Sequence, residues 1–160
     1  MARKVFFCFH YEDIWRVNAV RNAHIVEGCA AAGFQDASLW EAAKKKGDAA
    51  IKKLIDDALV GTSVTAVLIG PHTASREYVT YEIEKSLERG NGLLGVYIHN
   101  IKDQDKSTTY QGPAPNGLIQ AGAKLHTWDR DKFGDWVEDA YDAGQKKKEE
   151  AAALKKRLGW

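Results

Sequence analysis

The sequence of 160 residues lacks any apolar run long enough to cross a bilayer, so we expect neither a membrane-spanning helix nor a membrane partner. A net charge of +1 gives no reason to expect nucleic acid as a main partner. Residues 1–4 are charged but lead directly into an apolar segment, without the long apolar region and cleavage site of a secretory signal. Together these absences predict a cytoplasmic protein.

Cysteine and metal-binding patterns are also sparse. The two cysteines, Cys8 and Cys29, lie in apolar or alanine-rich surroundings, which is more typical of small core residues than of a disulfide or a metal pair. His24, His72 and His126 have no carboxylate or cysteine partners at metal-binding spacing, so no metal site is predicted. The chain has no G-x-G-x-x-G motif and no P-loop, which argues against a Rossmann dehydrogenase or a nucleoside triphosphatase.

What is present is an alternation of strand-like and helical segments, in a chain long enough for one domain. Strands are predicted at residues 5–9, 64–69, 93–98 and 125–128, with a short strand or extended segment at 33–41. Helices are predicted at 13–27, at 48–59 capped by Asp48, at 75–89 capped by Ser75, and from 133 onward. Right-handed crossovers turn this order into an α/β fold of three layers with a doubly wound, mainly parallel sheet.

Finer expectations concern loops, a helix face and the chain end. Residues 44–48 are predicted as a charged loop, and residues 101–117 as a long polar loop. In the 75–89 helix, Leu87 is expected to face the core together with Val79, Ile83 and Ser86. Residues 1–144 are expected to form the domain, and residues 145–160 a charged helical tail with little apolar surface.

The most informative segment is residues 62–88, where the apolar residues 64–69 stop at Gly70 and a helix follows. Glu82 lies beside the apolar stripe of that helix. In an open α/β sheet, ligands bind where the carboxyl end of a strand meets the following helix, so Glu82 is well placed to face a pocket. The alternative is an exposed helix residue, because acidic side chains are mostly solvated.

The blocks VFFCFHYEDIWRVN, DASLWEAAKKKGDAAIKKLI and YVTYEIEKSLERGNGLLGVYIHNIKD resemble the TIR domain family. More narrowly, they resemble the TIR-like sensor subunit of bacterial Thoeris anti-phage systems. The resemblance implies a flavodoxin-like TIR fold and cleavage of NAD at the nicotinamide–ribose bond, with NAD as substrate and no cofactor. It also implies an ADP-ribose-derived signal that activates an effector protein, a phage component as trigger, and a homo-oligomer.

The same resemblance assigns residues to the site. It places the family's catalytic glutamate on Glu82 and an aromatic residue four positions earlier on Tyr78, where many relatives have Trp. His10 stands where a Ser or a basic residue is common. Because His10, Tyr11 and Asp13 follow the first strand, we expect them to bind substrate. An equal alternative is that this segment caps the next helix, because Glu12 and Asp13 favour a helix N-terminus, and both roles can hold together.

Three further positions complete the predicted site. Phe9 and Trp40 are expected to stack on a ring of NAD, and Asn100 follows a strand at the ligand-binding end. Residues 44–46 are interpreted as a solvated basic run that can also steer an anionic dinucleotide.

The chemistry is consistent with a single carboxylate. Breaking the nicotinamide–ribose bond builds positive charge on the ribose, as in the oxocarbenium-like transition state of glycosidases. A carboxylate near the ribose stabilises that charge, and nicotinamide leaves without a strong general acid.

Of two other candidate functions, the sequence leaves one open and argues against the other. A non-catalytic TIR scaffold would act through homotypic contacts, and fold alone does not exclude it. A receiver-like module needs a phosphorylatable Asp at the end of the third strand, where this chain has Gly70.

Overall fold

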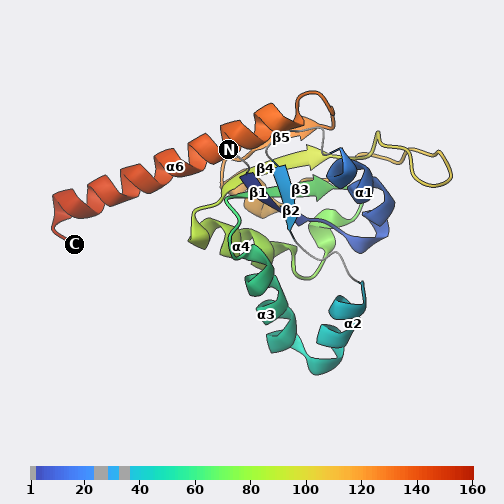
Figure 1. Cartoon of the computed structure of the whole chain (residues 1–160), viewed down its shortest axis with the longest axis horizontal. Helices are drawn as coiled ribbons and strands as arrows, with labels where there is room; N and C mark the ends of the chain where they lie inside the picture. The colour runs from blue at the N-terminus through green and yellow to red at the C-terminus, as the bar shows by residue number, and fades with distance from the viewer. Residues whose placement is uncertain (1–2, 24–28, 33–36) are drawn as a thin grey trace.

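Five parallel strands form one sheet in the order β2-β1-β3-β4-β5 (Figure 1). The computed structural model of the chain describes residues 3–23, 29–32 and 37–160. The strands are β1 (Arg3–Cys8), β2 (Cys29–Ala32), β3 (Val64–Ile69), β4 (Gly92–Tyr97) and β5 (Lys124–Thr127). This is the strand order of flavodoxin-like folds, so the predicted fold class is confirmed.

Helices cover both faces of the sheet and make it the middle of three layers (Figure 1). One face packs against α1 (Ile14–Asn22) and α6 (Phe133–Leu158). The other packs against α3 (Asp48–Leu59), α4 (Val79–Arg89) and α5 (Asn116–Gln120), with α2 (Ala37–Lys46) beside α3. Because β3 is enclosed between the layers, all six of its residues are buried, as its nearly all-apolar sequence predicted.

A buried polar cluster fixes the C-terminal half of α4 on the sheet. Thr65 Oγ1 on β3 lies 2.7 Å from Ser86 Oγ on α4. The Asn91 side chain, just after α4, donates to Thr62 Oγ1 at 2.9 Å and to Thr65 Oγ1 at 3.2 Å. Since buried hydroxyls and amides need such partners, the cluster sets the position of α4 and therefore of every side chain on it.

The prediction for residues 33–41 was wrong. The second strand lies earlier, at Cys29–Ala32, and Ala37–Lys46 is a helix. Of the predicted loop at 44–48, residues 44–46 belong to this helix and Asp48 begins the next one, so only Gly47 lies between them. Small alanines carry little strand preference, whereas Ala, Glu and Lys favour helix. The helix predicted at 13–27 ends at Asn22, and residues 24–28, like 33–36, lie outside the described part of the chain.

Two predicted helix caps were also wrong. Gly47, at φ +109°, occupies the N-cap position of α3, and Asp48 makes no capping hydrogen bond. Ser75 ends a 3-10 helix, η2 (Thr73–Ser75), and α4 begins only at Val79. Leu87 is 43% exposed instead of facing the core, because consecutive helix residues point about 100° apart and the neighbouring Ser86 is the one that faces the sheet. The predicted C-terminal stop is confirmed, since Gly90 adopts the left-handed conformation at φ +78°.

The long polar segment between β4 and α5 contains no helix or strand among its described residues, as predicted, although α5 already begins at Asn116. Arg16 on α1 holds this loop. Its Nε donates to the Ile101 carbonyl at 2.8 Å and its Nη2 to the Ser107 carbonyl at 2.9 Å. None of the described helices is both long and apolar enough to cross a membrane.

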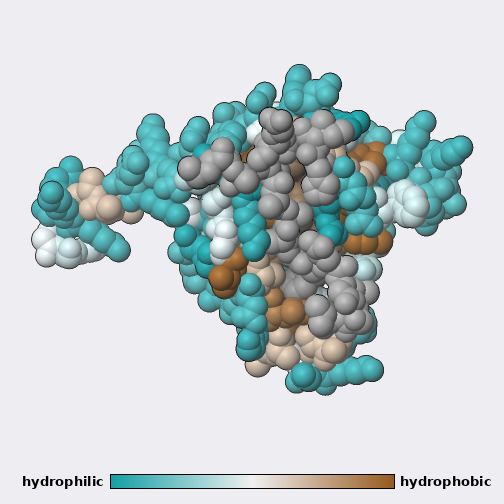
Figure 2. All heavy atoms as spheres, viewed as in Figure 1, coloured by the Kyte–Doolittle hydropathy of each residue, from teal (hydrophilic) through white to brown (hydrophobic). Residues whose placement is uncertain are grey.

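The C-terminal half of α6 projects beyond the sheet (Figure 1). Figure 2 shows this projecting end as mostly hydrophilic, with one small hydrophobic group. Every residue from 149 to 160 is exposed, so these turns bury no core of their own domain. The boundary between domain and tail at residues 144 and 145 stays a prediction, because α6 runs through it without a break.

We therefore expect truncation after Gly144 to leave the fold intact. The removed side chains are almost entirely solvated, so the melting temperature of the isolated protein should change by less than about 2 °C. Thermal unfolding followed by circular dichroism, compared with the full chain, measures this. A large drop would show that the tail stabilises its own domain.

Candidate active site

A cavity of 330 Å³ opens at the carboxyl ends of β1 and β3, beside the start of α4. We call it the Glu82 cavity. This is the edge of a parallel sheet at which α/β proteins bind ligands. Its lining comes from β1 and the turn after it, from α2, and from the segment leading into α4: Phe7, Phe9, His10, Tyr11, Trp40, Glu41, Lys44, Arg76, Glu77, Tyr78 and Glu82.

Glu82 lies in the first turn of α4 and is 1% exposed. The partial positive charge of a helix N-terminus favours a carboxylate at this position. Burial nevertheless raises the pKa of the Glu82 carboxyl above its ordinary value, because a low-dielectric site disfavours the charged form. The neighbouring Arg76 guanidinium opposes this rise.

Arg76 forms a buried ion pair with Glu82, in which its Nη2 donates to Glu82 Oε2. The same Nη2 lies 3.8 Å from Cys8 Sγ, and the Arg76 guanidinium carbon lies 5.8 Å from the centre of the Trp40 ring. Arg76 Nε is buried without a hydrogen-bond partner. The guanidinium therefore binds the Glu82 carboxylate through Nη2, while its Nε–H group makes no hydrogen bond.

The Cys8 thiol also contacts Glu82. Burial, followed by the charge of Glu82, raises the pKa of Cys8 well above its ordinary value, so the sulfur keeps its proton. A hydrogen bond between Cys8 and Glu82 favours the ionised carboxylate. Glu82 is thus held from two sides, by Arg76 and by Cys8.

Aromatic rings form one wall of the cavity. Trp40 on α2 meets Tyr78 edge to face, with ring centres 5.8 Å apart and planes at 86°. The Tyr78 hydroxyl donates to Asp48 Oδ1 at 2.7 Å, which raises the pKa of Tyr78 to about 12. Tyr78 is therefore neutral near pH 7, and Asp48 connects α3 to the cavity wall instead of capping its helix.

Comparison with known proteins identifies the family. The family described as "Thoeris protein ThsB, TIR-like domain" matches residues 6–103. The chain belongs to this ThsB TIR-like family. It is also 45% identical over 137 residues to a protein of Bacillus cereus (strain MSX-D12) named "Putative cyclic ADP-D-ribose synthase ThsB1", an alignment that covers 81% of this chain and 71% of the relative.

The structure brings most of the predicted site residues of this ThsB-family chain together. Glu82, Tyr78, Trp40 and the neighbouring residues Phe9, His10 and Tyr11 all line the Glu82 cavity. His10 also caps the 3-10 helix η1 (Tyr11–Asp13), since its Nδ1 accepts from the Glu12 amide at 3.1 Å. His10 is therefore both the cap of η1 and a residue of the cavity, whereas Asp13, at the N-cap position of α1, makes no capping side-chain hydrogen bond. The roles of these residues toward substrate stay predictions.

Two predicted residues lie elsewhere. Asp13 is 2% exposed, does not line the cavity, and pairs with Arg16 at 3.7 Å. Its carboxylate fills the space beside Gly70, where an added Cβ would lie 2.1 Å from Asp13 Oδ2. Asn100 is exposed and its Nδ2 donates to the Trp128 carbonyl at 3.5 Å. Both follow strand ends in sequence, but the chain turns their side chains away from the opening.

Arg76 is the main residue that the sequence did not reveal. It precedes Glu82 by six residues, a separation that no regular helix brings into contact. The contact forms because residues 76–78 lie between η2 and α4 and bend the chain back toward the carboxylate. Phe7, Glu41 and Glu77 also line the cavity without having been predicted.

We expect Arg76→Leu to destabilise the protein by about 3–5 kcal/mol at neutral pH, because it leaves the Glu82 charge buried without its partner. The double variant Arg76→Leu/Glu82→Gln should recover part of this loss. Lowering the pH should also reduce the stability loss of Arg76→Leu, since burial raises the pKa of Glu82 and protonation removes its buried charge.

Urea unfolding of wild type, both single variants and the double variant measures these differences. Arg130→Leu serves as control, because Arg130 is an exposed arginine outside the cavity. Equal losses in the single and double arginine variants would show that Arg76 stabilises the fold by packing and not by its charge.

Proposed function

We propose that this chain is an NAD-cleaving enzyme of anti-phage defence that breaks the nicotinamide–ribose bond and releases a cyclic ADP-ribose-type signal. The observation that carries the proposal is the buried Glu82 carboxylate in a cavity at the ligand-binding edge of the sheet. The printed name of its ThsB relative, a cyclic ADP-D-ribose synthase, describes the same reaction class.

Glu82 supplies what the bond cleavage requires. The C1′–N bond breaks with its electron pair leaving on the nicotinamide ring nitrogen, which turns the cationic pyridinium into neutral nicotinamide. The ribose then carries oxocarbenium character, which a nearby carboxylate stabilises more strongly in a site of low dielectric than in water. An enclosed position such as that of Glu82 therefore favours the transition state over the ground state.

The fate of the ribosyl cation decides the product. A nitrogen of the adenine ring closes the cycle by forming a new bond to C1′, whereas water gives ADP-ribose and a proton. The aromatic wall of Trp40 and Tyr78 supplies a surface on which a ring of the substrate can stack near Glu82. Such stacking favours ring closure because it keeps the adenine close and excludes water.

The free protein presents a resting form of this site. The ribose hydroxyls must reach a carboxylate that Arg76 and Cys8 already hold and that is 1% exposed. Turnover therefore requires Arg76 to move, which we assign to a second, less populated conformation favoured by oligomerisation or by a phage component as trigger. The signal then acts on an effector protein in the same cytoplasm.

We expect Glu82→Gln to lower signal formation at least about 100-fold while the protein remains folded, since Gln keeps the shape and removes the charge. The matched control is Glu84→Gln, an exposed carboxylate on the same helix, which should retain activity. Mass spectrometry of the products formed from NAD in lysate of infected cells measures the signal. Wild-type turnover by a folded Glu82→Gln protein would refute the catalytic role of Glu82.

We also expect dilute, isolated protein to cleave NAD slowly or not at all, because Arg76 occupies the carboxylate. The same protein should gain activity in lysate of infected cells. Nicotinamide release, measured in parallel with the oligomeric state by light scattering, tests this. Rapid cleavage by the monomer alone would contradict the resting-state assignment but not the reaction.

A further inference from the structure

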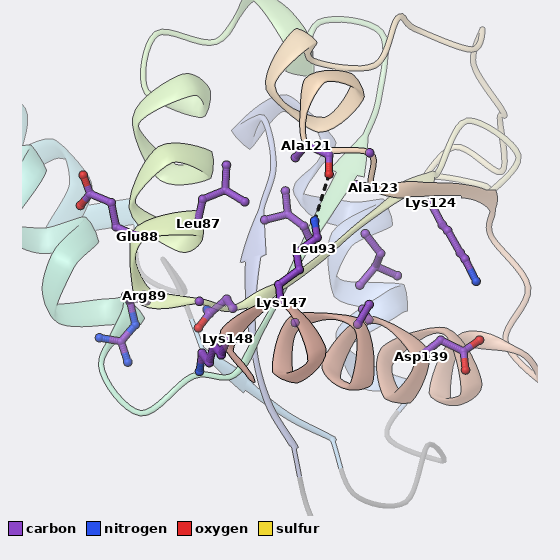
Figure 3. Close-up of a pocket in the computed structure, with 18 of the residues that line it drawn as sticks. Leu87, Glu88, Arg89, Leu93, Ala121, Ala123, Lys124, Asp139, Lys147 and Lys148 are labelled. Carbon is purple, nitrogen blue, oxygen red and sulfur yellow. Dashed lines mark hydrogen bonds between the residues drawn. The ribbon is translucent and has the colours of Figure 1, made fainter. Parts of the chain in front are cut away.

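A second cavity, of 570 Å³, lies at the amino ends of β4 and β5, at the opposite edge of the sheet from the Glu82 cavity (Figure 3). The last turn of α4, the turn between α5 and β5, and the side of α6 enclose it. We call it the α4–α6 groove. Its floor is apolar and contains Leu87, Leu93, Ala121, Ala123 and Ala143.

The rim of the groove is strongly basic. Arg89, Lys124, Lys147, Lys148 and Lys155 line it, against only two acidic residues, Glu88 and Asp139. None of these five cations forms an ion pair within the described part of the chain. Since the whole chain carries a net charge of only +1, this concentration of positive charge is local to the groove.

One lysine crosses the opening. Lys147 reaches from α6 over the floor, and its Nζ donates to the Ala121 carbonyl at 3.2 Å (Figure 3). Both groups stay accessible to water, so this hydrogen bond contributes little and can be exchanged for a contact with an anionic partner.

The apolar surface continues from the groove onto the projecting end of α6. Leu154 follows Lys147 by seven residues, and Leu158 follows Ala151 by seven, so both lie on the helix face that lines the groove. Their side chains are 45% and 50% exposed. From Trp136 to Leu158 this face of α6 extends about 33 Å. It is therefore too long for a mononucleotide ligand alone, and it equals the length of a partner helix of about six turns.

We propose that the α4–α6 groove and the adjoining Leu154–Leu158 face bind an acidic amphipathic helix from another protein. The apolar side of such a helix covers the floor and the two leucines, and its carboxylates pair with the basic rim. A nucleic acid fits less well, because it would lay a phosphate backbone over the apolar floor.

A second copy of this chain is also a poor occupant. Within residues 146–157 six Lys and Arg side chains stand against two Glu. Packing two such tails against each other, or one against the basic rim, would bring like charges together, which opposes association.

The test uses a fluorescent peptide of about 20 residues, long enough to follow α6, with Leu at core heptad positions and Glu elsewhere. The matched peptide carries Lys in place of every Glu. We expect the full-length protein to bind the Glu peptide in fluorescence anisotropy, with affinity that falls as salt increases, and not to bind the Lys peptide.

Three groove variants should each weaken binding of the Glu peptide about tenfold: Arg89→Glu, Lys148→Glu and Leu154→Glu. Lys45→Glu, which makes the same charge change on exposed α2, should not. Melting temperatures of all variants establish that they are folded, and Leu158→Glu replaces any that is not.

Several outcomes would overturn the proposal. These are no binding of the Glu peptide, equal binding of the Lys peptide, or equal loss of binding in Lys45→Glu. A dimer in light scattering that Leu154→Glu dissolves would assign the face to a second copy instead, and preferential binding of duplex DNA would assign it to nucleic acid.

Discussion

The buried ion pair between Arg76 and Glu82 is the interaction on which the site depends. Glu82 is enclosed almost completely, and an unpaired carboxylate in that position would either take up a proton or destabilise the fold. Arg76 favours the charged form of Glu82, and it occupies the carboxylate oxygen that the proposed reaction would use. If Glu82 has the catalytic role proposed above, stability of the folded protein and access to this carboxylate are opposed, because the contact that stabilises the buried charge also covers it.

Helix α4 connects this pair to the rest of the molecule. Its first turn carries Glu82, its C-terminal half is fixed on β3 through the Thr65–Ser86 hydrogen bond, and its last turn borders the α4–α6 groove. The two cavities thus lie at opposite edges of one sheet and share one helix. At the carboxyl edge, the buried Glu82 carboxylate and the rings of Trp40 and Tyr78 line a cavity suited to a small ligand. The amino edge gathers exposed cations around an apolar floor suited to a larger partner.

Sequence patterns predicted the elements whose signal is long and regular, and failed where the signal is short. The apolar face of α3 and the nearly all-apolar run of β3 are regular patterns typical of a packed helix and a buried strand, so both elements were predicted correctly. The alanine strand Cys29–Ala32 has no such signal, and the caps assigned to Asp48 and Ser75 failed because tertiary hydrogen bonds and a 3-10 turn took over those positions. Asp13 and Asn100 were assigned by their position after a strand, which does not determine where a side chain points.

By itself, the sequence determined strands β1, β3 and β4, the helices α1, α3 and α4 that alternate with them, the parallel sheet that follows from this alternation, and the expected place of Glu82 at the edge where such sheets bind ligands, but not β2 or α2. These depend on periodicity and on connections between neighbouring segments, which are local properties of the chain. Only the tertiary structure decided that Arg76 and Cys8 hold Glu82, that Trp40 forms the cavity wall, and that basic residues from α4, β5 and α6 surround one groove. Each of these contacts joins residues that lie far apart in the sequence or outside the regular spacing of a helix or strand. Only the packing of the elements against one another brings them together.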